Sequence, residues 1–246
     1  SGDAPDPGAI HGARTALERE IAEAMGDLPE RLYAALQTPG PYSPDAEAAG
    51  RRALRNRALS WLTARDPEAG AARAQADSAG YMTDRMAALA LLVKQGAADA
   101  ALAQFRDDWA GDRLVMDKWF SVQAAYAPPG NAVATVERLV SDPDFHWKTP
   151  NRFRAVIGAF ASANPAGFHH ESGEGYDFVA DWLLRLDPVN PQTAARLSAV
   201  FGRWRAFDER RSETMRAALE RIAGAPQLSR DSAEMVGRLL RTDPES

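Results

Sequence analysis

Apolar residues recur along this chain at the spacing of an α-helix. Residues 153–160 place four large apolar side chains at positions i, i+3, i+4 and i+7, which lie on one face of a helix. The same pattern recurs over residues 197–204, and a narrower version runs over residues 215–222. Each stripe predicts a helix that turns one face towards a hydrophobic core.

Proline and glycine divide this helical pattern into short elements. The strongest interruption is at residues 38–44 (TPGPYSP), which no helix could cross. Alternating strand patterns are nearly absent. Further breaks are predicted at residues 66–67, 128–130, 142–144, 149–151, 173–175, 187–188 and 190–191. The spacing of the breaks predicts about a dozen helices of about 10–16 residues with short connectors.

These elements predict an all-α fold. About a dozen helices cannot share the core of one four-helix bundle, so we expect an irregular α-α superhelix, a solenoid-like stack of antiparallel helix pairs. No strict period of the tetratricopeptide or ankyrin kind is visible. We expect residues 1–246 to form a single helical domain, with residues 1–44 as a candidate N-terminal helical subregion and residues 45–246 as the main array.

Composition and charge narrow the class of protein. The 246 residues are 45% hydrophobic and 26% charged, with a net charge of -5, which is typical of a soluble globular protein and unfavourable for nucleic-acid binding. The chain has no cysteine, which excludes disulfides, thiolate metal sites and cysteine nucleophiles. The longest apolar run, near residues 86–93, is too short to cross a bilayer. We therefore expect a cytoplasmic setting, with neither a nucleic-acid nor a membrane partner.

The histidines form no recognisable catalytic or metal-binding motif. A zinc hydrolase on a helix needs a His-Glu-x-x-His sequence, and the four histidines include no i, i+4 pair. They are His11, His146, His169 and His170. The cluster at residues 169–171 (HHE) has poor geometry for one metal ion, so we favour a loop with ordinary hydrogen bonds. Nucleophile-elbow and phosphate-loop motifs are also missing, and the sequence predicts no catalytic residue, metal ligand or cofactor in this chain.

Arginines are the remaining candidates for binding chemistry. Arg152 and Arg154 flank Phe153 at the start of a predicted helix, and Arg196 lies on a later one. A guanidinium fork binds carboxylates well, although a solvated or salt-bridged surface is the default role of such residues. From the residues alone, the chain is a soluble helical array of unassigned purpose.

Several strings are more specific than this pattern. Residues 115–120 (VMDKWF) and residues 150–160 (PNRFRAVIGAF) resemble signatures of the C-terminal domain of the bacterial aminopeptidase N family, the alanyl aminopeptidases. Further matches in the same order are 52–56 (RALRN), 82–84 (MTD), 164–166 (NPA), 168–169 (FH), 173–176 (GEGY), 190–192 (NPQ) and 215–219 (MRAAL). The resemblance runs from about Ile10 to about Leu240, so it covers almost the whole chain.

The resemblance implies a supporting role in a larger enzyme. The resemblance implies a gluzincin metallopeptidase built from four parts. In such an enzyme, a helical C-terminal domain covers the active site of a thermolysin-like zinc domain. The zinc would belong to the parent enzyme, and the present chain alone is expected to be inactive. Its expected partners are the catalytic and N-terminal domains of the same polypeptide and short peptide substrates, and an apolar docking face could let the isolated chain self-associate.

The resemblance also singles out Arg154 and Arg196. By motif, they match two arginines that face the internal cavity in this family, where they could attract the C-terminal carboxylate of a short peptide. The alternative is that both arginines only brace neighbouring helices. Two other functions stay open for the whole chain: a solenoid-type peptide or protein binding scaffold with no enzymatic parent, and an independent hydrolase with an unrecognised site.

Overall fold

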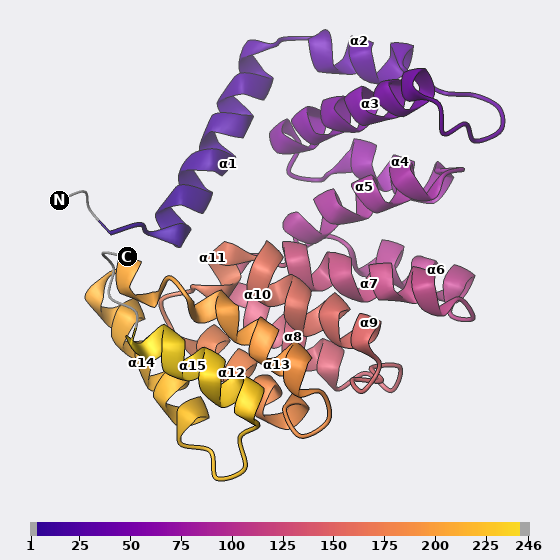
Figure 1. The fold of residues 1–246 in the computed structure, drawn as a ribbon. Helices are drawn as coiled ribbons and strands as arrows, with labels where there is room; N and C mark the ends of the chain where they lie inside the picture. The colour runs from indigo at the N-terminus through magenta and orange to yellow at the C-terminus, as the bar shows by residue number, and fades with distance from the viewer. Residues whose placement is uncertain (1–3, 242–246) are drawn as a thin grey trace. The chain divides into compact units, whose positions relative to one another are not determined.

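The computed structural model describes residues 4–241 (Figure 1). Within this range the chain forms α-helices with short 3₁₀ and π-helical segments and no strand, which confirms the all-α prediction. The chain divides into two compact units. The N-terminal unit is His11–Pro128, and the C-terminal unit comprises the described residues of Ser1–Ile10 and Pro129–Ser246. The expected single domain with a subregion at residues 1–44 stays a prediction.

The N-terminal unit consists of helices joined by turns and by one longer loop. They are α1 (Pro7–Ala24), which begins in the other unit, α2 (Leu28–Ala35), α3 (Ala46–Arg65), α4 (Gly70–Ser78), α5 (Met82–Lys94), α6 (Asp99–Trp109) and α7 (Arg113–Tyr126). The longer loop lies between α2 and α3. The helix α2 packs on α3, α4 packs on α5, and α5 packs on α7. The side chains of Leu59, Leu89, Leu92 and Phe120 are fully buried in this core.

A buried polar network joins α2, α3, α4 and α5. The Asn56 amide donates to Oδ1 of the buried Asp84 at 2.8 Å. The Gln75 amide donates to Oδ1 of Asn56 and to the main-chain oxygen of Asp84, each at 2.8 Å, and Tyr33 donates to Gln75 at 2.9 Å. The strings 52–56 and 82–84, which carry part of the family resemblance, therefore meet in the fold as paired polar groups that buried positions require.

The C-terminal unit contains more and shorter elements. They are η1 (Pro129–Asn131), α8 (Ala132–Val140), α9 (Pro150–Phe153), η2 (Arg154–Gly158), α10 (Ala159–Ala163), α11 (Pro165–Phe168), α12 (Glu174–Leu186), α13 (Pro191–Ser198), η3 (Ala199–Phe201), η4 (Trp204–Ala206), α14 (Glu209–Ala223) and α15 (Arg230–Arg241). Proline opens α9, α11 and α13, where its missing N–H costs no helical hydrogen bond. The starts of α9 and α13 coincide with breaks expected at residues 149–151 and 190–191.

Aromatic rings fill the core of the C-terminal unit. Phe168 makes edge contacts with Phe160, Tyr176 and Phe201, at centroid distances of 5.9, 5.2 and 5.8 Å. All four side chains are fully buried. Around them α12 packs on α13 and α14, and α15 packs on α13 and α14 (Figure 1).

None of the helices in the described part of the chain combines the length and apolar character that crossing a bilayer requires.

Candidate functional site

Arg154 lies at the first position of a π-helical turn, η2 (Arg154–Gly158), between α9 and α10. The stripe predicted over residues 153–160 is buried as expected, with Val156, Ile157 and Phe160 at 0% exposure. The sequence pattern predicted a regular helix here and did not show the π-turn. Because a π-turn inserts an extra residue, it changes the direction of the side chains at its start, and such turns are frequent at functional sites.

The Arg154 side chain is exposed and folds back along its own helix. Its Nε donates to the main-chain oxygen of Pro150 at 3.1 Å, and a terminal nitrogen donates to Oδ1 of Asn151 at 3.0 Å. Neither acceptor is a carboxylate, so no ion pair within residues 4–241 neutralises this guanidinium. Both contacts lie within one turn and do not connect Arg154 to a separate helix.

Arg196 is exposed on α13. The N-cap Asn190 fixes the start of this helix by accepting a hydrogen bond from the backbone of Thr193, and Ala194, Ala195 and Ser198 form its buried face. Among the described residues, the Arg196 side chain makes no hydrogen bond or ion pair, and nothing of this kind joins it to Arg154. The two predicted site residues thus share one unit and are both exposed.

The neighbouring Arg152 behaves differently. It is only 6% exposed, and its guanidinium donates to the main-chain oxygen of Asp144 in the preceding loop. Arg205 is also structural, because it donates to the last carbonyl groups of α15 at Leu239 and Leu240. No local signal in the sequence separates these bracing arginines from the exposed ones.

The histidine cluster forms ordinary hydrogen bonds, as expected. His169 Nδ1 lies 3.0 Å from Tyr176 Oη, and His170 Nδ1 lies 3.1 Å from Ser172 Oγ. The two imidazoles therefore face different partners. Within residues 4–241, no group of three or more His, Asp or Glu side chains is placed to hold a metal ion.

His169 lies at the centre of a larger polar cluster. Arg211 donates to the main-chain oxygen of His169 at 2.8 Å and pairs with Asp208 at 2.6 Å and Asp6 at 3.3 Å. Burial, together with the positive charge of Arg211, lowers the pKa of His169 to about 4, while burial raises the pKa of Tyr176. His169 is therefore neutral at physiological pH. Sequence reasoning missed Arg211 because it lies far from His169 along the chain.

Comparison with known proteins places these features in a family. The family model described as "Domain of unknown function (DUF3458_C) ARM repeats" matches residues 2–241. The chain is 43% identical to aminopeptidase N of Caulobacter vibrioides and 38% identical to aminopeptidase N of Escherichia coli; each match covers 97% of this chain and 28% of the relative.

A solved structure of an aminopeptidase also matches this chain. The crystal structure of Legionella pneumophila aminopeptidase A in complex with aspartic acid matches 98% of this chain and 29% of its own chain, with a TM-score of 0.87 and 30% identity. The present chain thus spans little more than a quarter of the length of these proteins. It belongs to the DUF3458_C ARM-repeat family and corresponds to the C-terminal domain of aminopeptidase N.

Proposed function

We propose that this chain is the noncatalytic C-terminal domain of a cytoplasmic zinc aminopeptidase, in which it covers the active-site cleft and controls peptide access during removal of N-terminal amino acids. The observation that carries the proposal is the match of nearly the whole chain to about 28% of each aminopeptidase N. The zinc and the catalytic residues would then belong to the remainder of the polypeptide, which is the domain's first partner.

A helical domain over a cleft has clear physical consequences. It excludes water from the reaction, restricts the size of the substrate and defines the route of entry. It would also keep folded proteins away from the metal. These effects require only a rigid surface, and the helices of each unit pack on buried apolar cores.

Arg154 and Arg196 are the proposed contacts of this domain with short peptides. Each guanidinium is exposed, neither forms an ion pair within residues 4–241, and neither links two separate helices through a polar contact. A guanidinium without a carboxylate partner is suited to bind the C-terminal carboxylate of a peptide.

Reconstitution tests the proposed function. The remaining portion of the parent polypeptide is assayed with and without residues 1–246, using a short alanyl peptide and a folded protein with an N-terminal alanine. Addition of the chain is expected to increase cleavage of the peptide relative to the folded protein. An unchanged ratio, despite a stable complex, would contradict control of access.

The isolated chain provides the control. It is expected not to release amino acids from an alanyl arylamide. Zinc-dependent cleavage by residues 1–246 alone would instead support an independent hydrolase.

A further inference from the structure

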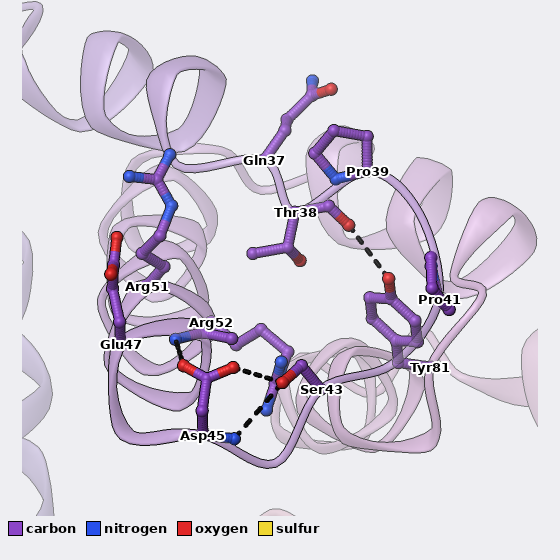
Figure 2. A pocket seen from close by; sticks show the side chains of 11 residues that line it. Gln37, Thr38, Pro39, Pro41, Ser43, Asp45, Glu47, Arg51, Arg52 and Tyr81 are labelled. Carbon is purple, nitrogen blue, oxygen red and sulfur yellow. Dashed lines mark hydrogen bonds between the residues drawn. The ribbon is translucent and has the colours of Figure 1, made fainter.

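A cavity of about 360 Å³ lies in the N-terminal unit, between the loop that follows α2 and the start of α3 (Figure 2). Figure 2 shows Thr38 and Pro39 on one side of the open space, Arg51 on α3 on a second side and Tyr81 on a third. The volume is at the lower end of the range of small-molecule sites. Neither Arg154 nor Arg196 belongs to this unit.

The wall of the cavity is held by specific contacts. The Tyr81 hydroxyl donates to the main-chain oxygens of Thr38, at 3.0 Å, and of Gly40. Gly40 has a φ of 99°, a backbone conformation that favours glycine. At the other end of the loop, Asp45 caps α3 by accepting a hydrogen bond from the Ala48 N–H at 2.8 Å. The loop is therefore fixed at both ends.

Arg52 lines this cavity and has no polar partner in the described chain. Arg52 is only 4% exposed. Its guanidinium carbon lies 4.6 Å from the centre of the Tyr42 ring and 5.9 Å from the centre of the Tyr81 ring. Within residues 4–241 it makes no hydrogen bond and no ion pair. Aromatic rings stabilise a cation but supply few acceptors, so the guanidinium of this largely buried residue keeps donors that an acceptor in the cavity can use.

The two acidic residues that line the cavity do not pair with Arg52. Asp45 is engaged by the Ala48 N–H and by Ser43, and neither Asp45 nor Glu47 forms an ion pair with Arg52. Both carboxylates do line the cavity, and their negative charge opposes a doubly charged anion more than a singly charged one. Arg51, which donates to the main-chain oxygen of Ala35 at 3.1 Å, adds a second positive charge.

We propose that this cavity binds a carboxylate group, which accepts hydrogen bonds from the buried Arg52. The two tyrosine rings hold the guanidinium in place, and the planar donor fork matches a carboxylate. The carboxylate can come from a small free acid or from an acidic side chain of the polypeptide beyond residues 1–246. The chemistry of recognition is the same for both sources.

Titration of residues 1–246 with sodium acetate tests the proposal, at an ionic strength kept constant with sodium chloride. The ¹⁵N resonance of Arg52 Nε and the amide resonances around the cavity are expected to shift in a saturable way, with a millimolar Kd. Inorganic phosphate is expected to bind more weakly. Absence of a saturable shift at Arg52, or tighter binding of phosphate, would overturn the proposal.

A variant pair locates the contact. Arg52→Gln is expected to raise the Kd for acetate at least tenfold. Arg185→Gln is the matched control, because Arg185 also lies over two rings, Trp147 at 5.0 Å and Trp182 at 4.7 Å, but is exposed in the other unit. Equal Kd values for both variants would count against the site. If Arg52→Gln does not fold, the resonance shifts of the unmodified chain still show whether acetate binds at Arg52.

Calorimetric titration of the parent polypeptide distinguishes the two sources. Acetate binding that depends on Arg52 indicates a site for a free acid. Loss of acetate binding in the parent, while residues 1–246 retain it, indicates a carboxylate supplied by the rest of the polypeptide. Acetate binding by the parent that is unchanged in its Arg52→Gln variant would overturn the assignment.

Discussion

Asp187, which follows α12, binds Ser229, which precedes α15, through both of its carboxylate oxygens. The Ser229 N–H donates to Oδ2 at 2.7 Å, and its hydroxyl donates to Oδ1 at 2.6 Å. The hydroxyl of the buried Ser232 donates to the same Oδ1 at 2.5 Å. The Ser229 hydroxyl in turn caps α15 by accepting a hydrogen bond from the Ser232 N–H at 3.2 Å. Asp187 therefore holds the capping residue of the last helix of the described chain and connects two segments that are distant in sequence.

Replacement of Asp187 is expected to destabilise the protein strongly. The residue is only 2% exposed, and Asp187→Ala leaves three donors without their acceptor. The free energy of unfolding, measured by urea denaturation at pH 7.5, should fall by about 2–4 kcal/mol. Asp181→Ala on the same α12 is the control, because its ion pair with Arg221 is exposed and should contribute about 1 kcal/mol or less. Similar losses of stability for both variants would argue against this role of Asp187.

The pH dependence of stability should report on His169. Its pKa is lowered to about 4 in the folded protein, below the ordinary value near 6.5, so the unfolded chain binds the proton more readily. The contribution of neutral His169 to the free energy of unfolding is complete above about pH 6.5. About 1–3 kcal/mol of this free energy is lost as the pH falls towards 4.

Unfolding in urea at pH 7.5 and pH 5 measures this effect. The difference in the free energy of unfolding between pH 7.5 and pH 5 should be smaller in His169→Gln than in the unmodified protein. His170→Gln, which removes the neighbouring imidazole that is bonded to Ser172, is the matched control. If the His169 variant keeps the full pH dependence, another group is responsible.

Arg154 and Arg196 should affect peptides more than amides. In the parent enzyme, Arg154→Ala or Arg196→Ala is expected to lower kcat/KM for alanyl tripeptides about tenfold to a hundredfold, because a charge-assisted hydrogen bond to the C-terminal carboxylate is lost. An alanyl arylamide has no such carboxylate, and its kcat/KM should change little. Arg216→Ala, which removes an exposed arginine paired with Glu220, is the matched control. Equal effects on both substrates would support a bracing role.

Two glycines should respond in opposite ways to alanine. A Cβ at Gly175 would lie 2.6 Å from the main-chain oxygen of Phe168, so Gly175→Ala forces the backbone apart and should cost about 1–3 kcal/mol. Gly50 lies within α3 with nothing in the space of a Cβ, and Gly50→Ala should stabilise by up to about 1 kcal/mol. Thermal unfolding of the two variants measures both changes, and a stable Gly175→Ala protein would contradict the close approach.

Local patterns in the sequence predicted many of the helices, but the stripe over residues 197–204 was wrong as a single helix, because it covers the end of α13 and the 3₁₀ segments η3 and η4. The stripe over residues 153–160 is buried, and proline opens helices at Pro150 and Pro191. These features depend on residues within about one helical turn of each other, so periodicity and turn chemistry are sufficient to find them. The π-turn at Arg154 escaped prediction because the same apolar spacing is compatible with a regular helix.

The candidate sites also differ in whether local sequence or tertiary structure identified them. The sequence by itself pointed to Arg154 and Arg196 through the strings around them, and it gave no reason to choose Arg52. Tertiary structure alone decided that Arg52 is buried without a polar partner and that Asp187 meets Ser229. Burial and long-range pairing depend on how separate helices pack, and a local sequence pattern carries no information about which distant side chain will fill a given position.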